Sequence, residues 1–401
     1  MSTDPDYDPH DDVAALLREI PLPPTRITTE HAISMGRKAI RRRRRGITAA
    51  AAAAVVAATA GGFTLANPAP RPAPLNLPLH SALPTPSASP SPVNLTGWTV
   101  APLPLLDGTV ATVAAMDSTG RYIAGTTSGF KAIVWDNLSP RLLPPPSSTI
   151  DDLQVVNVNS TGSVVGNAAG GGSSGYAWVY RDDAATKLPA PRAGGRYLAR
   201  DINDRGDILG WSERSGPILW RATASRTAAP TVLSNVDDAY ALGDDGSVGG
   251  TANDGDHPVV LSPTGQARRM AELPGKPGGK VFAISGNWAC GWVPADTDSN
   301  LMSARWNMTT GELTPFPSVT SFPVAISASG AFLAGRGRFG SKVLVLPDGT
   351  IVELPTLSGS PLERGTELDA VAITADGTMI AGNQSGLKAS SRIPALWRRT
   401  G

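Results

Sequence analysis

The chain is 401 residues long, with a formal net charge of +1 and a single cysteine, Cys290. This excludes an intramolecular disulfide and a cysteine-ligated metal site, and the near-neutral charge argues against a nucleic-acid partner. The 43 glycines and 36 prolines are typical of a chain with many tight turns, and the excess of arginine over lysine is typical of a GC-rich bacterial genome.

Residues 1–46 form a charged segment that is punctuated by proline and ends in five consecutive arginines. Residues 11–20 have the apolar spacing of a short amphipathic helix, and a second helical stretch is expected over about 28–45. The segment has too little apolar surface for a core of its own. We therefore expect a cytoplasmic tail that is partly helical or disordered.

Residues 47–66 carry no charge and are rich in alanine. As a helix they would extend about 30 Å, which matches the hydrocarbon core of a bilayer. The arginines that precede them place the N-terminus in the cytoplasm and the rest of the chain outside. A cleaved signal peptide and twin-arginine export are the alternatives. The sequence favours an uncleaved, single-pass transmembrane helix with membrane lipid around it.

Residues 67–96 contain nine prolines among serine, alanine and threonine. Such a composition favours polyproline II structure without a packed core. We expect a semi-rigid stalk that holds residues 97–401 away from the membrane.

A unit of four short strands repeats through residues 97–401. Each unit has an apolar first strand, a polar turn, a second strand that ends in glycine, a third strand that often ends in tryptophan, and a Leu-Pro strand. The glycine recurs every 40 to 47 residues, at Gly125, Gly166, Gly210, Gly250, Gly291, Gly335 and Gly382. This spacing is typical of the blades of a β-propeller.

The seventh unit lacks its fourth strand because the sequence ends after Trp397 and four further residues. A matching segment, Val100 to Pro104, stands ahead of the first unit. If it pairs with the seventh unit, the ring closes between its two ends and leaves no open sheet edge. The predicted fold is therefore an all-β, seven-bladed propeller whose N-terminal strand completes the last blade.

Two recurring residue sets have structural explanations. The residue after each first strand is Asp117, Asn159, Asn203, Gly243, Ser285, Ser327 or Thr374, and such side chains close tight turns through backbone hydrogen bonds. The tryptophans at the ends of third strands are expected to pack between blades, and Cys290 to be a small buried side chain. A ring of polar ligands and a sugar-stacking array are the alternatives for the first two sets.

The repeats resemble the bacterial extracellular HAF family, whose units read roughly I-N-x-x-G-x-ϕ-ϕ-G before an apolar strand. The stretches that carry the resemblance are "DINDRGDILGWSERSGPILWR" from Asp201, "NVNSTGSVVG" from Asn157 and "AITADGTMIAG" from Ala372. The His-Ala-Phe tripeptide of the family is replaced here by sequences such as "KAIVW". The resemblance implies a secreted or surface propeller-like domain and supplies no catalytic residues.

One face of the predicted propeller should carry the variable segments. In a four-stranded blade, the loops between second and third strands and the links between blades lie on the same face, which we call the loop-rich face. Variable loops on a fixed scaffold are typical of binding surfaces, although a solvated rim is the alternative. The candidate binding residues on this face are Arg192, Arg196, Asp254, Asp256, Asp296, Asp298, Arg336, Arg338, Lys388 and Arg392.

A second candidate site lies beside the central channel. Most first strands carry alanine just before their last apolar residue, but the second and third have Asn157 and Asp201, with Arg200 next to the latter. These three residues form a predicted channel polar cluster. Its members either contact a ligand or satisfy one another internally.

Signals for catalysis are weak. The sequence "GGSSG" at 171–175 matches a nucleophile motif by letters, but no helix is predicted after it. His257 is the sole histidine of 97–401, and "NDGDH" at 253–257 lacks the spacing of a calcium loop. We expect no catalytic residues, no cofactor and no metal.

Three functions fit these features. The first is a non-catalytic, membrane-anchored binding or scaffold propeller that recognises an envelope protein or glycan. The second is a transmembrane sensor whose tail docks a cytosolic regulatory partner. The third is a glycan-active enzyme. The sequence favours the first.

Overall fold

The computed structural model describes residues 93–94, 97–147, 152–168, 175–225, 227–252, 254–296, 301–335, 342–357, 367–385 and 392–400. Three predicted segments lie outside these ranges: the tail, the transmembrane helix at 47–66, and the stalk except for residues 93–94. Within them, no helix has the length and apolar character needed to span a bilayer.

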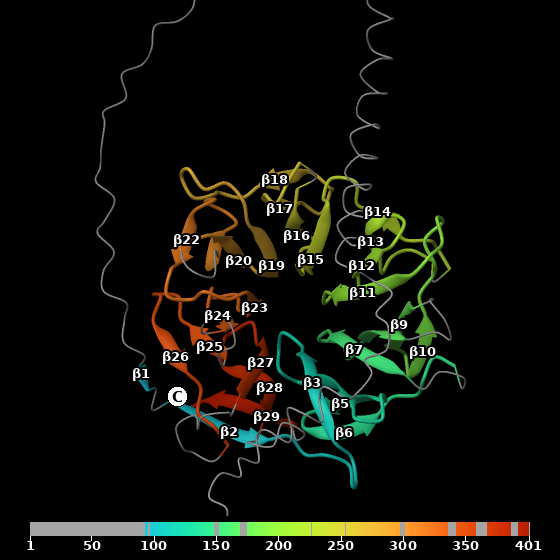
Figure 1. The fold of residues 1–401 in the computed structure, drawn as a ribbon. Helices are drawn as coiled ribbons and strands as arrows, with labels where there is room; N and C mark the ends of the chain where they lie inside the picture. The colour runs from blue at the N-terminus through green and yellow to red at the C-terminus, as the bar shows by residue number, and fades with distance from the viewer. Residues whose placement is uncertain are drawn as a thin grey trace, which may run out of the picture. The chain divides into compact units, whose positions relative to one another are not determined.

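The described residues form seven antiparallel blades of four strands, as predicted (Figure 1). The first three blades are β3–β6 (Ala111–Met116, Tyr122–Thr127, Ala132–Asp136, Ser139–Leu142), β7–β10 (Leu153–Val158, Val164–Ala168, Tyr176–Arg181, Ala184–Lys187) and β11–β14 (Tyr197–Ile202, Ile208–Ser212, Gly216–Trp220, Thr231–Val232). The next two are β15–β18 (Asp238–Leu242, Val248–Thr251, Pro258–Leu261, Ala267–Arg269) and β19–β22 (Lys280–Ser285, Trp288–Pro294, Leu301–Asn307, Leu313–Phe316).

The last two blades contain strands from the N-terminal end of the described chain. The sixth is β23–β26 (Pro323–Ile326, Phe332–Gly335, Lys342–Val345, Ile351–Glu353), to which β1 (Val93–Asn94) adds in parallel on β26. The seventh is β27–β29 (Glu367–Ile373, Met379–Ser385, Arg392–Arg399), completed by β2 (Trp98–Pro102). The first strand of every blade lies innermost and faces the axis of the ring (Figure 1).

The predicted closure of the ring is confirmed. Strand β2 pairs antiparallel with β29, with Val100 opposite Trp397. The strand begins and ends two residues earlier than the predicted segment. Beyond Pro102, Leu103 donates one further hydrogen bond of 2.9 Å to the Pro394 carbonyl of β29, and the carbonyl of Pro104 accepts one of 2.6 Å from Trp135 Nε1 in the first blade.

Four of the five tryptophans at the ends of third strands join their blade to the one before it; the fifth, Trp178, is buried without a hydrogen-bond partner for its indole nitrogen. Trp135, Trp220, Trp306 and Trp397 are all buried, and each indole N–H donates to a carbonyl just after the outer strand of the preceding blade, at Pro104, Pro189, Ala271 and Pro355. The expectation that these tryptophans form core is confirmed. Each one fills an interface between blades and satisfies its only polar atom there.

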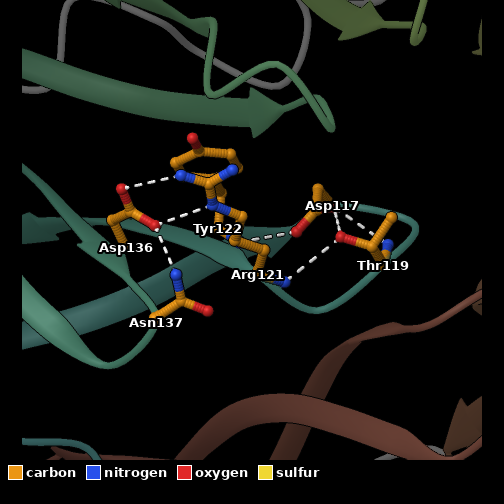
Figure 2. Close-up of polar contacts among 6 residues, drawn as sticks. All are labelled: Asp117, Thr119, Arg121, Tyr122, Asp136 and Asn137. Atoms are coloured by element: carbon orange, nitrogen blue, oxygen red, sulfur yellow. Dashed lines mark hydrogen bonds and ion pairs between the residues drawn. The ribbon is translucent and has the colours of Figure 1, made fainter.

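The polar residues after the first strands close their turns, as expected. In the first blade, Asp117 accepts hydrogen bonds from the backbone N–H groups of Thr119 and Tyr122 at 2.9 and 2.6 Å (Figure 2). In the same figure, Arg121 forms a two-point ion pair with Asp136 on β5. Asn159, Asn203, Ser327 and Thr374 accept backbone hydrogen bonds in the equivalent turns. Their side chains are therefore occupied in holding the turns.

The recurring glycines permit a close approach inside six of the seven blades, whereas in the sixth blade Ala334 pairs with Pro323 beside the bulge. Every innermost strand has a bulge where it pairs with the second strand. A Cβ atom would come within 1.7–2.5 Å of an inner-strand carbonyl oxygen at Gly125, Gly166, Gly210, Gly250, Gly291 and Gly382. Any larger residue would therefore force two backbones apart, which explains the strict period of glycine in the sequence.

We predict that Gly250→Ala destabilises the protein by about 2–3 kcal/mol or more, because the new Cβ meets the Asp238 carbonyl oxygen at 2.0 Å and backbone atoms cannot step aside. Urea unfolding followed by tryptophan fluorescence measures the effect. The matched control is Gly97→Ala, where nothing lies within 4 Å of the added atom. Equal stability of the two variants would contradict the close-approach explanation.

Candidate functional site

The bulges of the seven inner strands line a central channel. The extra residue at each bulge is Ala114, Val156, Arg200, Tyr240, Phe282, Val324 or Val371. All seven border one cavity of about 290 Å³ on the propeller axis. The next residue along six of the seven strands also lines the cavity, which gives a second ring that includes Asn157 and Asp201. The channel is therefore built from one equivalent position repeated in every blade.

The channel is polar and aromatic on one side and aliphatic on the other. Blades one, two, six and seven contribute only alanine or valine at the bulge, whereas blades three, four and five contribute Arg200, Tyr240 and Phe282. Arg200 was predicted from the sequence as a channel residue, whereas Tyr240 and Phe282 were not. A usable signal was present, because both occupy positions at which most repeats have a small aliphatic residue.

The predicted channel polar cluster is partly assembled. Asn157 Nδ2 donates to Asp201 Oδ1, and Asp201 Oδ2 accepts a 2.7 Å hydrogen bond from the backbone N–H of Leu242 in the fourth blade. Asp201 therefore joins three neighbouring blades. Burial raises the pKa of its carboxyl to about 7, although hydrogen bonds to Leu242, Asn157 and Ile202 oppose that rise.

Arg200 lies beside this cluster but bonds to a different partner. Its guanidinium forms an ion pair with Asp238 and donates to the Ala239 carbonyl at 2.6 Å. The second oxygen of Asp238 accepts a 2.6 Å hydrogen bond from the hydroxyl of Tyr240. Burial and this hydrogen bond raise the pKa of Tyr240. Asp238 thus holds both Arg200 and Tyr240 at the channel entrance.

A row of aromatic rings continues from Tyr240 across the entrance. Edge-to-face contacts join Tyr240 to Phe282 (5.0 Å between ring centroids), Phe282 to Phe322 (5.5 Å) and Phe322 to Trp292 (6.4 Å). Phe322 is 48% exposed, and Val324, two residues further along the chain, is 38% exposed. We call the set Arg200, Asp238, Tyr240, Lys280, Phe282, Trp292 and Phe322 the mouth cluster.

The mouth cluster lies at the loop-rich end of the inner strands. Asp238 and Lys280 are the first residues of β15 and β19, and Phe322 immediately precedes β23. Lys280 forms an ion pair of 3.2 Å with Asp256, which lies in the loop between the second and third strands of the fourth blade. The cluster therefore opens on the face that the sequence predicted to bind.

The predicted binding residues of that face do not form one group. Asp254, Asp256 and Asp296 are held in ion pairs with Arg269, Lys280 and Lys276 around blades four and five. Arg192 and Arg196 are exposed in the link from the second blade to the third. Arg392 borders a separate cavity of about 520 Å³ with Val110 and Phe130. Asp298, Arg336, Arg338 and Lys388 lie outside the described residues.

On the opposite face, the turns contact one another around the channel. Ser118 Oγ donates to Asp204 Oδ2 at 2.8 Å and so joins the first blade to the third. The backbone N–H of Asp204 donates to Asp244 Oδ1 at 2.9 Å. Ala375 N–H donates to the Ser118 carbonyl, and Ala328 N–H to that of Ala375. These bonds draw five of the seven turns together, and Asp204 and Asp244 line the channel at this end.

His257 and Cys290 do not line the channel cavity. His257 Nδ1 contacts Glu272 on the fourth blade. Cys290 is fully buried, as expected, and burial raises the pKa of its thiol. Most of the 171–175 segment lies outside the described ranges. Among the residues that the structure does describe, none group as three or more potential metal ligands.

No protein-family model and no curated protein matches this chain, so its resemblance to the HAF repeats stays a prediction. Solved structures do match. Virginiamycin B lyase from Staphylococcus aureus aligns at a TM-score of 0.50 and 15% identity, covering 76% of this chain and 99% of that one. A chain of the mitotic checkpoint complex aligns at 0.50 and 13% identity, covering 83% and 99%. At these identities the likeness shows the propeller fold alone.

We predict that Asp201 makes stability fall as pH rises from about 4 to about 7. In that window the unfolded chain, with a carboxyl pKa of 3.8, has lost the proton that the folded protein keeps up to about pH 7, and proton binding by the folded state stabilises it at lower pH. Asp201→Asn should remove this fall, as measured by urea unfolding at several pH values.

The control for this experiment is Asp376, whose contribution to stability changes with pH in the opposite direction. The hydroxyl of Thr374 lowers the pKa of Asp376, so that carboxylate contributes stability above its unfolded pKa and loses it as pH falls. Asp376→Asn should therefore flatten a rise with pH and leave the Asp201 effect in place. Identical pH slopes for the wild type and Asp201→Asn would contradict the assignment.

Proposed function

We propose that this protein is a non-catalytic binding propeller, anchored in the bacterial cell membrane by residues 47–66, that recognises an envelope protein or glycan at the mouth cluster. The observation that carries the proposal is the row of partly exposed aromatic side chains at the opening of a central cavity. Aromatic side chains grouped at a concave surface are typical of recognition sites.

The polar members of the mouth cluster support binding of the partner in one specific orientation. Arg200 and Lys280 both pack near the ring of Tyr240, at 5.2 and 6.0 Å from its centroid, and each is paired with an aspartate. Paired charges around an apolar centre fix the register of a partner and contribute less to its affinity. We assign affinity to the aromatic rings and orientation to the ion pairs.

The location of this function rests on the sequence. The uncharged segment at 47–66, the arginines before it and the proline-rich residues after it favour a propeller held outside the membrane. The activity of the Staphylococcus aureus lyase supports no catalytic role here, because the likeness to that enzyme extends to the fold alone.

We predict that Phe322→Ala weakens retention of the partner about tenfold or more. The full-length chain would be immobilised and exposed to solubilised envelope extract from the source organism, with retained material identified by mass spectrometry and its affinity then measured. Truncation of an aromatic side chain at the centre of a contact typically costs about 1–4 kcal/mol of binding. Phe322 is half exposed, so its removal should leave the fold intact.

The matched control is Phe130→Ala. Phe130 is 50% exposed in the loop between the second and third strands of the first blade, beside the cavity at Arg392. It shares residue type, exposure and face with Phe322 but lies outside the mouth cluster. If partner retention is lost with Phe130→Ala and not with Phe322→Ala, the binding site lies at the first blade and the proposal is contradicted.

A further inference from the structure

The central channel changes chemical character along its axis. At the loop-rich end, Phe282, Phe322 and Val324 present aromatic and aliphatic surface. Asp201 lies deeper, in the second ring, and Asp204 and Asp244 line the far end. A molecule entering from the loop-rich face would therefore meet apolar side chains first and carboxylates last.

The charges along the channel do not balance. Arg200 is the sole cation among the described residues that line the cavity, and Asp238 at the entrance already neutralises it. No second cation lines the described channel wall to pair with Asp201, Asp204 and Asp244. Burial and the nearby charges of Asp204 and Asp245 raise the pKa of Asp244, although the hydrogen bond from the Asp204 backbone N–H and the charge of Arg205 oppose that rise. The carboxylates therefore destabilise one another's charged forms, and an added cation would relieve this.

The volume of the channel limits the size of the molecule that can enter it. Its volume of about 290 Å³ lies at the small end of the range for ligand pockets, roughly 300–1,000 Å³. A sugar chain would also need hydrogen bonds on the aliphatic side, where Val156, Val324 and Val371 offer none. A single long side chain fits both limits better than an oligosaccharide does.

Arginine and lysine have the same polarity gradient as the channel. Their methylene stems are apolar and their heads are cationic, and aromatic rings attract such heads electrostatically. The protein itself shows that its aromatic wall accepts them, because the guanidinium of Arg200 packs 5.2 Å from the Tyr240 centroid. Three donors reach Asp201, and a carboxylate has about four acceptor positions.

We propose that the channel binds an arginine or lysine side chain of a partner protein, which enters from the loop-rich face. The stem packs against Phe282, Phe322 and Val324, and the head lies near Asp201 with Asp244 beyond it. This inference rests on the proposed function and narrows it, since it assigns the partner to proteins and identifies the anchoring side chain by its charge and length.

The test compares capped pentapeptides that carry arginine, lysine or citrulline between glycines. Citrulline has the shape of arginine without its charge. Isothermal titration of the full-length chain should show both cationic peptides binding at least about tenfold more tightly than the citrulline peptide, because only they pair with the channel carboxylates. At pH 7 their binding should also release protons, since a nearby cation lowers the pKa of Asp201.

The variants locate the carboxylates that matter. Asp201→Asn and Asp244→Asn should each reduce the preference for arginine over citrulline at least about threefold, and Asp201→Asn should abolish the proton release. Asp348→Asn is the control, because Asp348 lies in an outer turn of the sixth blade, between β25 and β26. Asp348→Asn should change neither the preference for arginine over citrulline nor the proton release.

Several outcomes would overturn the inference. One is equal binding, or equal absence of binding, of the arginine and citrulline peptides. Another is binding of a neutral oligosaccharide such as maltohexaose in their place, which would assign the mouth cluster to a glycan. If partner retention still depends on Phe322 in either case, the inference fails and the proposed function stands. If retention is independent of Phe322, the proposed function fails as well.

Discussion

The bulge in each inner strand is the constraint on which both the blade and the channel depend. In six of the seven blades it brings the inner strand so close to the second strand that only glycine fits opposite, with carbonyl oxygens 1.7–2.5 Å from where a Cβ would lie. The same bulge places one extra side chain at the channel wall in every blade. One backbone irregularity therefore fixes the period of the repeat and also supplies seven positions at which residue type can vary without disturbing the core.

The ring around this channel is held by interactions between consecutive blades. Buried indole N–H groups donate to carbonyls of the preceding blade at four interfaces. Asn159 and Asn203 add side-chain hydrogen bonds to the carbonyls of the next turn, both of 3.0 Å. Strand β2 joins the two ends of the ring through β29. Because these bonds do not involve the bulge residues, blades three to five can have polar or aromatic residues at the bulge where the other blades have alanine or valine.

The side chains of the channel wall break the symmetry of the repeated fold. A strictly repeated ring would present seven identical side chains and could not distinguish the orientations of a partner. Here Asp238 holds Arg200 and Tyr240 in place on one side, and Phe322 remains half exposed beside them. The ion pairs of Asp256 and Asp296 surround this centre as a polar rim. Under the proposed function, this apolar centre and charged rim are the recognition surface.

The sequence by itself determined the number of blades, the closure of the ring, the turn chemistry and the burial of the tryptophans, because each depends on contacts within one repeat or between neighbours. It also identified Asn157, Arg200 and Asp201 as exceptions to the repeat. Only the tertiary structure decided that Arg200 pairs with Asp238, that Tyr240, Phe282 and Phe322 form one row, and that the rim carboxylates are already paired. Those contacts join side chains from different blades, and their partners depend on the bulge and on the curvature of the ring, which no spacing in the sequence encodes.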